Sequence, residues 1–218
     1  MEYLGPILFV LFYALRPSFI YGGNENGQIF DTSAIWNMDQ VARWGVYAWV
    51  AHFLKREYET AFIHKFSRAT MPLRNLFKNC TYYWSFGAAI GYPLCTSSFV
   101  APSEMQVYIG LAIFILSELG NLTIHIMLAN MRPAEGSKKR DIPKGFGFDL
   151  VACPNYTFEV MSWVGFSIFT GLWFGWAFTA LGFYQMQEWA QGKHATYKKT
   201  YDKEYTQLNR KAIIPFVY

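Results

Sequence analysis

The sequence predicts an all-α fold, a polytopic membrane bundle of about six to seven transmembrane helices that forms one domain over residues 1–218. Two observations lead to this prediction. The chain is 53% hydrophobic and 20% aromatic but only 16% charged, which is more apolar surface than a soluble core of this size requires. The apolar residues also gather in stretches of about 20, the length that one helix needs to cross a bilayer.

Five apolar stretches give the predicted helices, at Tyr3–Ile20, Val41–Ile63, Thr81–Phe99, Met105–Met131 and Leu150–Trp189. The first has no basic start and no small-residue cleavage site, so we expect a retained helix and not a signal peptide. The last is too long for one crossing. It predicts a helical hairpin that turns near Thr170–Gly171, with halves that are short for full spans, and so six crossings in all.

The segments between these helices alternate in charge. Segments 64–78 and 132–144 and the tail 193–211 are rich in Lys and Arg, whereas segments 22–33 and 92–104 contain neither residue. Short loops rich in Lys and Arg stay on the cytoplasmic side of a membrane. The pattern therefore predicts that the N-terminus and the C-terminus are both cytosolic.

The three cysteines, Cys80, Cys95 and Cys153, are widely spaced and odd in number. This pattern fits neither a disulfide framework nor a zinc site with paired ligands, and we interpret them as packing residues. The sequence also lacks the phosphate-binding loop, the H-E-x-x-H zinc motif and the G-x-S-x-G nucleophile motif. No metal site is expected.

Four ionisable residues interrupt the second apolar stretch. His52, Lys55, Arg56 and Glu59 are spaced by three and four, which places them on one face of a helix. Each such group costs about 2.5–3.5 kcal/mol at the centre of a membrane helix, so it normally faces the protein interior or a cavity. Two interpretations remain open: an internal ion-pair network, or a cationic wall for an anionic ligand.

Polar residues also occur in the fourth stretch and at the start of the fifth. Asn121 and His125 lie one turn apart on one face, and Arg132 follows about two turns later. Such groups either join membrane helices by hydrogen bonds or line a ligand site. The fifth stretch begins with the motif "CPNYTFEVMSW", whose polar residues Asn155, Tyr156 and Glu159 allow the same two interpretations.

The tail combines cations with aromatic rings, at His194, Tyr197, Tyr201, Tyr205, Arg210 and Lys211. This composition suits a segment that lies on anionic lipid. It suits phosphates and a nucleotide ring equally well, and both interpretations stay open.

Four motifs, "MPLRNLFKNCTYYW", "LGNLTIHIMLANMRP", "CPNYTFEVMSW" and "KHATYKK…RKAIIPF", closely resemble the very-long-chain trans-2-enoyl-CoA reductases of the endoplasmic reticulum, which belong to the steroid 5α-reductase family. The resemblance covers essentially the whole chain. It is specific, because the patterns N-Y-x-x-E-x-x-x-W and R-K-x-x-I-P-F occur together and in order. Such enzymes commonly carry a ubiquitin-like domain before the membrane part, which this sequence does not show.

The resemblance implies NADPH-dependent reduction of the 2,3 double bond of a very-long-chain trans-2-enoyl-CoA, the last step of each fatty-acid elongation cycle. It implies an enzyme in contact with membrane lipid and other elongation enzymes, and no nucleic-acid partner. A hydride that adds to C3 leaves enolate charge on the thioester oxygen, and C2 then needs a proton from a positioned acid. Tyr156 is the candidate acid, and Lys55 is the candidate helper that the resemblance places on its helix.

The resemblance also implies the cofactor site. An amide and a carboxylate suit the carboxamide and ribose hydroxyls of a nicotinamide nucleotide, and guanidinium groups can grip phosphate with two hydrogen bonds. The residues that match cofactor-binding positions of the family are Asn155, Glu159, Arg132, His194, Tyr197 and Arg210, and Asn121 and His125 are assigned to the same pocket.

Other functions remain as alternatives. A steroid or polyprenol double-bond reductase of the same family is the nearest, but Phe53 stands where steroid reductases carry a tyrosine that binds the ketone, although Tyr58 lies about one turn away. The basic 64–78 segment, with Lys65, Arg68, Arg74 and Lys78, favours the phosphates of an acyl-CoA, although the rule that basic loops stay cytoplasmic also explains it. A methyltransferase that uses S-adenosylmethionine and a non-enzymatic scaffold of the elongation complex are separated from a reductase by whether the protein binds NADPH.

Overall fold

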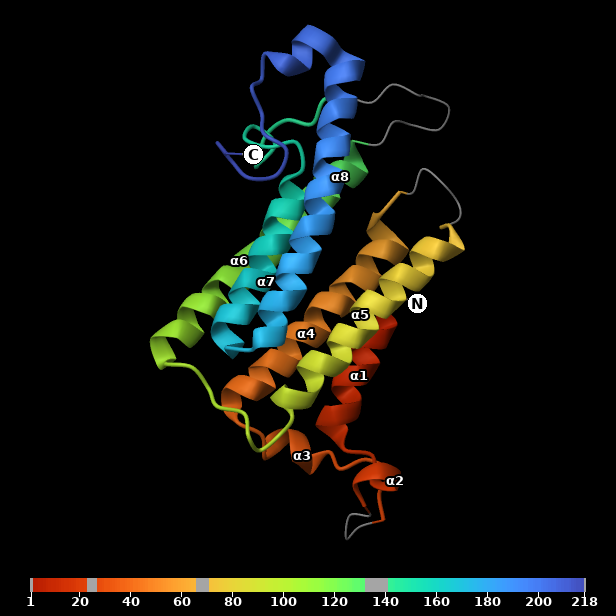
Figure 1. Cartoon of the computed structure of the whole chain (residues 1–218), viewed down its shortest axis with the longest axis vertical. Helices are drawn as coiled ribbons and strands as arrows, with labels where there is room; N and C mark the ends of the chain where they lie inside the picture. Colours follow the sequence, from red (N-terminus) through yellow and green to blue (C-terminus); the bar gives the residue numbers. More distant parts are fainter. Residues whose placement is uncertain (1, 23–26, 66–70, 132–140, 218) are drawn as a thin grey trace.

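The computed structural model describes residues 2–22, 27–65, 71–131 and 141–217 (Figure 1). These residues form helices and connecting segments, and the β structure among them consists of isolated bridges, such as the one that joins Val151 to Lys211. The predicted all-α class is confirmed for this part of the chain.

The long helices are α1 (Leu4–Leu15), α4 (Gln40–Tyr58), α5 (Leu73–Leu94), α6 (Glu104–Asn130), α7 (Pro154–Thr170) and α8 (Trp173–Thr206). Two short helices, α2 (Ser18–Tyr21) and α3 (Ser33–Trp36), lie in the segment between α1 and α4, and a π-helical turn (Glu59–Ile63) extends α4. Each apolar stretch of the sequence therefore contains a helix.

Two helices extend beyond the predicted apolar stretches. Helix α5 begins at Leu73, directly after Pro72, because proline is compatible with the start of a helix and polar residues continue the helix where no apolar pattern marks it. Helix α8 continues past Trp189 for the same reason, since the lysines of the tail are good helix formers, and it reaches Thr206 across a kink at Asp202, where φ is 42°. Hydrophobicity alone does not reveal these polar extensions.

The predicted hairpin is present. Helix α7 ends at Thr170, helix α8 begins at Trp173, and Gly171 between them has a φ of 67°. This left-handed conformation is the usual end of a helix and favours glycine, which has no Cβ to clash with its own backbone. Gly171 thus stops one helix and lets the chain reverse at the expected place.

Helices α6 and α7 cross at very short range. A Cβ added to Gly165 would lie 2.5 Å from the backbone nitrogen of Phe114, and one added to Gly110 would lie 2.5 Å from that of Phe169. Small residues permit such close backbone approach between membrane helices. The two glycines therefore set how α7, which carries "NYTFE", sits against α6.

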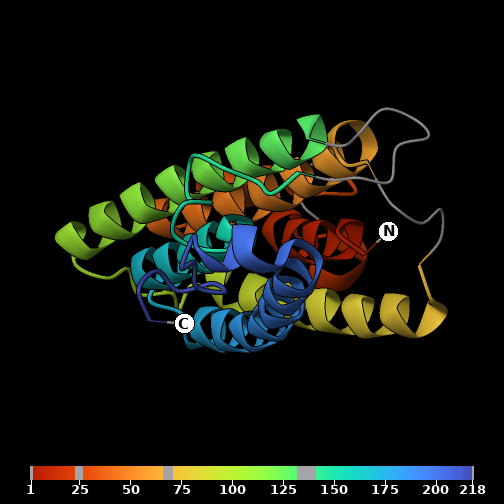
Figure 2. The same ribbon diagram turned by 90° about the horizontal axis from the view of Figure 1, so that it is seen from above.

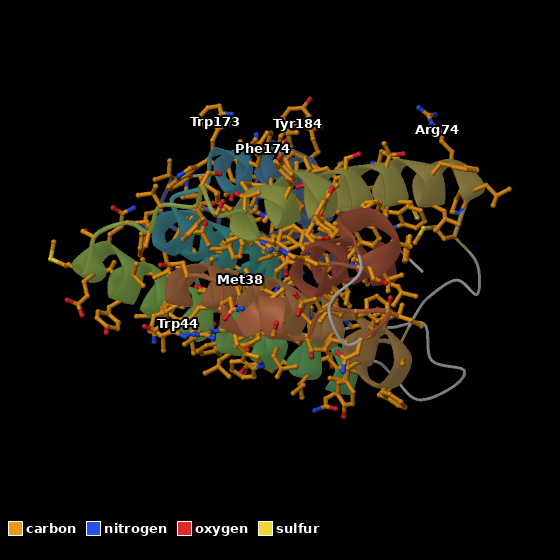
Figure 3. All side chains as sticks on the ribbon, turned by 90° about the horizontal axis from the view of Figure 1, so that it is seen from below. Met38, Trp44, Arg74, Trp173, Phe174 and Tyr184 are labelled. Atoms are coloured by element: carbon orange, nitrogen blue, oxygen red, sulfur yellow. The ribbon has the colours of Figure 1, made fainter. Side chains whose placement is uncertain are left out.

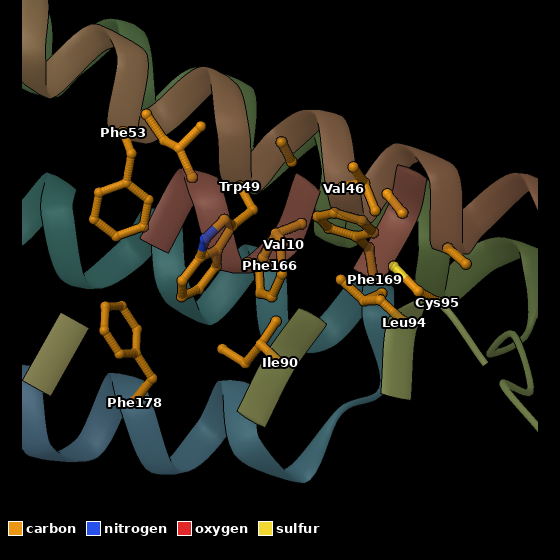
Figure 4. Close-up of a cluster of buried hydrophobic side chains, with 14 of the residues drawn as sticks. Val10, Val46, Trp49, Phe53, Ile90, Leu94, Cys95, Phe166, Phe169 and Phe178 are labelled. Carbon is orange, nitrogen blue, oxygen red and sulfur yellow. The ribbon is translucent and has the colours of Figure 1, made fainter. Parts of the chain in front are cut away.

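The centre of the bundle is a cluster of aromatic side chains (Figure 4). Trp49, Phe166 and Phe169 are fully buried, and the Trp49 indole donates a 3.0 Å hydrogen bond to the carbonyl of Pro6. This contact joins α4 to α1 and satisfies the polar atom of a buried tryptophan.

Figure 1 shows the end of α6, the start of α5 and the C-terminal half of α8 at one end of the bundle, with α2 and α3 at the other. The described residues that lead into the basic segments, at the end of α6 and the start of α5, therefore lie at one end of the bundle together with the tail (Figure 1). Among the described helices, α6 is long and apolar enough to cross a membrane by length and composition. The number of crossings and their orientation stay predictions.

Candidate active site

A cavity of about 330 Å³ lies between the helices, and apart from Tyr3 its lining residues come from the end parts of α4 and α6, the first parts of α5 and α7, and the middle of α8. This volume is within the range of about 300–1,000 Å³ that is usual for small-molecule sites. The lining residues are Tyr3, His52, Arg56, Lys78, Asn79, Tyr82, Tyr83, Asn121, His125, Asn155, Tyr156, Glu159, Trp163, Phe178, Leu181, Gly182, Tyr184, Gln185, Met186 and Trp189.

The cavity has two chemically different walls. Helices α4, α6 and α7 supply polar groups such as His52, Asn121 and Glu159, whereas α5 and α8 supply mostly aromatic and apolar groups such as Tyr82 and Phe178. Polar groups at membrane depth are tolerated where they face a cavity or other protein. The polar residues that interrupt the apolar stretches therefore gather around one site.

A chain of ion pairs lies behind the polar wall. His52 is 2% exposed, and its Nδ1 lies 2.8 Å from Glu118 Oε1 while its Nε2 lies 3.2 Å from Glu159 Oε1. The second oxygen of Glu118 is 2.8 Å from Lys55 Nζ. Glu118 was missed by the sequence analysis, although its spacing to Asn121 and His125 puts all three on one face of α6.

A second group of charges surrounds Glu59, which is fully buried. Arg56 Nη1 lies 2.6 Å from Glu59 Oε2, and His125 Nδ1 lies 3.0 Å from the same oxygen. Arg56 Nη2 also donates to the Tyr3 hydroxyl at 3.2 Å. The ion-pair interpretation of the α4 stripe is thus observed, and two of its members, His52 and Arg56, line the cavity as well.

Glu59, His64 and His125 offer ligand atoms within 4.8 Å of one another, which is a spacing that a metal site can have. The Arg56 guanidinium is already placed there, 2.6 Å from Glu59 Oε2 and 3.2 Å from His125 Nδ1. Because a cationic side chain already balances the carboxylate, we assign no metal to this group.

Asn121 connects three helices through one side chain. Its Oδ1 accepts a 2.7 Å hydrogen bond from Lys55 Nζ, and its Nδ2 donates to the Asn155 carbonyl at 2.9 Å and to Glu159 Oε2 at 3.0 Å. Lys55 itself is not among the lining residues. Lys55 is therefore connected to the backbone next to Tyr156 only indirectly, by two hydrogen bonds of the Asn121 side chain.

Asn155 and Tyr156 face the cavity with unused polar groups. Neither the side-chain amide of Asn155 nor the hydroxyl of Tyr156 hydrogen-bonds to another described residue. The Tyr156 ring packs against Trp189, with ring centroids 6.2 Å apart, and Lys193 Nζ lies 5.7 Å from the Tyr156 centroid. A ligand in the cavity would meet a free amide and a free phenol side by side.

The remaining candidates of the tail form a separate group at the end of the bundle. His194 Nδ1 lies 2.9 Å from the Tyr205 hydroxyl, and the rings of Tyr197 and Tyr205 are 5.3 Å apart. Burial lowers the pKa of His194, with Lys198 and Lys211 acting in the same direction. Burial also raises the pKa of Tyr205 to about 12.

Arg210 is buried beneath this group. Its Nη1 donates a 2.7 Å hydrogen bond to the Pro143 carbonyl, and its Nη2 lies 3.9 Å from Asp149 Oδ1. The guanidinium thus fastens the tail to segment 141–153, which leads into α7. Arg132, the other predicted phosphate ligand, lies outside the described residues.

The tail and the cavity share one small apolar core. Tyr156 and Tyr197 both pack against a buried cluster that includes Cys153 and Ile213, and Thr157 Oγ1 donates to the Ile213 carbonyl at 2.6 Å. The structure therefore brings the cavity residues into contact with the terminal "RKAIIPF" motif, although His194, Tyr197 and Arg210 do not line the cavity.

Phe53 is the residue that the resemblance contrasts with a tyrosine in steroid reductases. It is fully buried against Trp49, His52, Tyr83 and Trp163, and it is not among the lining residues. The side chain at this position serves the core.

Comparison with known proteins identifies the family. Residues 69–218 match the family described as 3-oxo-5-alpha-steroid 4-dehydrogenase. The chain is 46% identical to a protein of Caenorhabditis elegans named probable very-long-chain enoyl-CoA reductase, with 99% of this chain and 69% of the relative covered. It is 42% identical to the very-long-chain enoyl-CoA reductase of Dictyostelium discoideum, with 99% and 68% covered.

A human relative is more distant. The chain is 32% identical to the protein named trans-2,3-enoyl-CoA reductase-like of Homo sapiens, with 99% of this chain and 59% of that protein covered. Because the family match spans most of the chain and the two nearer relatives align over nearly all of it, this protein belongs to the 3-oxo-5-alpha-steroid 4-dehydrogenase family.

Proposed function

We propose that this protein reduces the 2,3 double bond of very-long-chain trans-2-enoyl-CoA with NADPH, in the membrane of the endoplasmic reticulum, as the last step of fatty-acid elongation. The relatives at 42–46% identity are named enoyl-CoA reductases, which supports this substrate class. The observation that carries the proposal is that Tyr156 and Asn155 both line the cavity, while the hydroxyl of one and the side-chain amide of the other have no hydrogen-bond partner among the described residues.

The polar wall fits a nicotinamide nucleotide. The carboxamide of Asn155 is free to pair with the carboxamide of a nicotinamide, and the Glu159 carboxylate is an acceptor for ribose hydroxyls. NADPH, when bound, supplies the hydride that adds to C3 of the substrate. We propose that His194, Tyr197 and Arg132 serve the phosphate and adenosine end, while Arg210 holds the tail in place through the Pro143 carbonyl.

Tyr156 completes the reduction as the proton donor. Addition of the hydride to C3 moves the double-bond electrons toward the thioester oxygen, and Tyr156 gives its hydroxyl proton to C2 of the resulting enolate. One hydride and one proton thus convert the double bond to a single bond. The phenolate that remains takes a proton from water at the cavity mouth.

Lys55 acts on this step from a distance. Its ammonium holds Asn121, which in turn holds the backbone carbonyl of Asn155, the residue before Tyr156. We therefore assign Lys55 the role of a positioning residue. Such an arrangement keeps the phenol in line with C2, and small displacements of a catalytic group are costly to the rate.

The test is NADPH oxidation by the detergent-purified full chain with a long-chain trans-2-enoyl-CoA. Replacing Tyr156 by Phe removes the proton and leaves the ring, so kcat should fall by about 10²–10⁴, the usual contribution of a general acid. The NADPH dissociation constant, measured by fluorescence, should stay within a factor of about two. Tyr108→Phe is the matched control, because Tyr108 is an exposed tyrosine on α6 that hydrogen-bonds only to Glu104 among the described residues.

Three other outcomes have distinct meanings. If the Tyr156→Phe variant keeps the kcat of the wild type, Tyr156 is not the proton donor. Binding of NADPH without reduction of the enoyl-CoA refutes the substrate, and a sterol or polyprenol is then assayed. A wild-type protein that binds no nucleotide refutes the reductase function and favours a scaffold.

A further inference from the structure

The cavity opens sideways between α5 and α8. The lining residues that are exposed are Lys78 on α5 and Leu181, Tyr184 and Trp189 on α8, whereas those of α4, α6 and α7 are buried or half-buried. Leu181 is 55% exposed and Tyr184 is 66% exposed. Figure 2 shows α5 and α8 as neighbours along one side of the bundle, and the Tyr82 hydroxyl joins them through the Phe178 carbonyl at 2.7 Å.

Two lysines and two aromatic rings form a row across this mouth. Lys78 Nζ lies 5.7 Å from the ring centroid of Trp189, the centroids of Trp189 and Tyr156 are 6.2 Å apart, and Lys193 Nζ lies 5.7 Å from the centroid of Tyr156. Trp189 and Lys193 are one turn apart on the same face of α8. We call these four residues the mouth row.

The cations of the mouth row and those near the polar wall differ in whether an acidic side chain is paired with them. Lys55 and Arg56 are balanced by Glu118 and Glu59. Lys78 instead donates to the neutral Gln185 Oε1 at 2.7 Å, and among the described residues neither Lys78 nor Lys193 forms an ion pair. The mouth row therefore presents uncompensated positive charge.

We propose that the two lysines of the mouth row, with Trp189 between them, bind the phosphate-bearing end of the CoA thioester, while the thioester lies at Tyr156 and the acyl chain follows the aromatic wall and leaves between α5 and α8. This inference rests on the proposed function. It goes beyond it by assigning Lys78, Trp189 and Lys193 to the substrate and by placing the lateral exit.

The order of groups along the substrate supports this placement. In an acyl-CoA the thioester lies between the acyl chain and the phosphates, so a thioester at Tyr156 has its chain on one side and its phosphates on the other. Near Tyr156 the structure offers apolar side chains in one direction, Phe178 and Leu181, and the exposed Lys193 in the other. Ammonium groups are strong donors to phosphate oxygens.

The surface beyond the mouth is also apolar. Trp173, Phe174 and Tyr184 project from α8 to the outside on the same side of the bundle as Arg74 of α5 (Figure 3). Trp173 is 75% exposed. A chain that leaves between the two helices would pass directly onto a surface that suits lipid.

The experiment compares two thioesters of the same trans-2-enoyl chain, one on CoA and one on N-acetylcysteamine, which carries no phosphate. In the double variant Lys78→Gln and Lys193→Gln, the KM for the CoA thioester should rise about tenfold, because two exposed charge contacts are lost. The kcat should stay within about twofold, and the KM for the N-acetylcysteamine thioester should not change. Lys199→Gln is the control, since Lys199 is an exposed lysine farther along α8.

Several results would overturn the proposal. If KM rises equally for both thioesters, or does not rise for the CoA thioester, the two lysines do not bind the CoA phosphates. A rise of the KM for NADPH instead assigns the lysines to the cofactor. An effect that appears in vesicles with anionic lipid and is absent in pure phosphatidylcholine assigns the lysines to anionic lipid headgroups. Failure of the wild type to reduce either thioester is a failure of the proposed function itself.

Discussion

Glu118 Oε1 lies 2.8 Å from His52 Nδ1, so one carboxylate of α6 holds an imidazole of α4 whose other nitrogen faces Glu159 of α7 at 3.2 Å. A carboxylate oxygen close to each ring nitrogen favours an imidazole that carries a proton on both nitrogens. The cluster then contains the cations His52, Lys55 and Arg56 and the carboxylates of Glu59, Glu118 and Glu159, and it is balanced in charge. A balanced cluster fixes the helices and offers little net attraction to an anion.

Glu118→Gln should lower both activity and stability. The amide keeps the shape of the carboxylate but cannot balance His52 and Lys55, and removal of one partner from a buried ion pair typically costs about 3–5 kcal/mol. We expect kcat to fall at least tenfold, because Lys55 no longer holds Asn121 in one place, and the thermal midpoint to fall as well. The measurements are enoyl-CoA turnover and thermal unfolding in detergent.

Glu188→Gln is the matched control for this variant, since Glu188 is an exposed glutamate of α8. It should leave both quantities unchanged. If Glu118→Gln keeps the kcat of the wild type although its thermal midpoint is lower, Glu118 is structural and does not position Lys55.

Gly165→Ala should destabilise the α6 and α7 pair. The added methyl would lie 2.5 Å from the backbone nitrogen of Phe114, and backbone cannot move aside as a side chain can. Overpacking of this kind costs about 1–3 kcal/mol. Gly192→Ala in α8 is the counterpart, because no atom lies within 4 Å of its added methyl, and it should stabilise the protein by about 0.5–1 kcal/mol.

Thermal unfolding of the two alanine variants under identical detergent conditions tests the predicted loss of stability in one and the predicted gain in the other. Opposite shifts of the midpoint support the close crossing of α6 and α7. A Gly165→Ala protein at least as stable as the wild type would show that the helices are not so close.

The tail should lose stability below neutral pH through His194. Partial burial and the charges of Lys198 and Lys211 hold the pKa of His194 below its usual value, so the unfolded chain binds a proton more readily than the folded one. The stabilisation is therefore complete above the unfolded pKa of about 6.5 and is lost as the pH falls through and below it.

The pH dependence is measured by hydrogen exchange of the tail at pH 5.5 and pH 7.5 in the wild type and in His194→Gln, which cannot titrate. Protection of residues 194–206 should fall at the lower pH in the wild type and stay nearly constant in the variant. The same loss of protection in both proteins would exclude His194 as the cause.

The apolar stretches located the helices because about 20 apolar residues have few other stable arrangements, and Gly171 marked the hairpin turn because glycine readily adopts the left-handed conformation. The cysteines were also predicted as packing residues, and Cys95 and Cys153 are buried. The start of α5 and the length of α8 were not predicted, since polar helix carries no hydrophobic signal.

The candidate site was only partly predictable. The α4 stripe and the Asn121 and His125 pair were found from spacing, but Glu118 was missed, although a lone carboxylate in an apolar helix is itself a signal. Arg210 was predicted to hold phosphate, and the structure shows its guanidinium buried and bound to the Pro143 carbonyl. Its contact joins residues 67 positions apart, which no local pattern reveals.

The sequence by itself determined the helical class, the helix positions and the face of each helix that carries polar groups, because these depend on composition and on the period of 3.6 residues per turn. Only the tertiary structure decided that Lys55 pairs with Glu118, that Asn121 links Lys55 to the residue before Tyr156, and that the exposed lining residues of the cavity lie on α5 and α8. The physical reason is that the helical period determines only the direction in which each side chain leaves its own helix axis. Which side chains of two helices meet depends also on the distance between the helices and on the rotation of each about its axis.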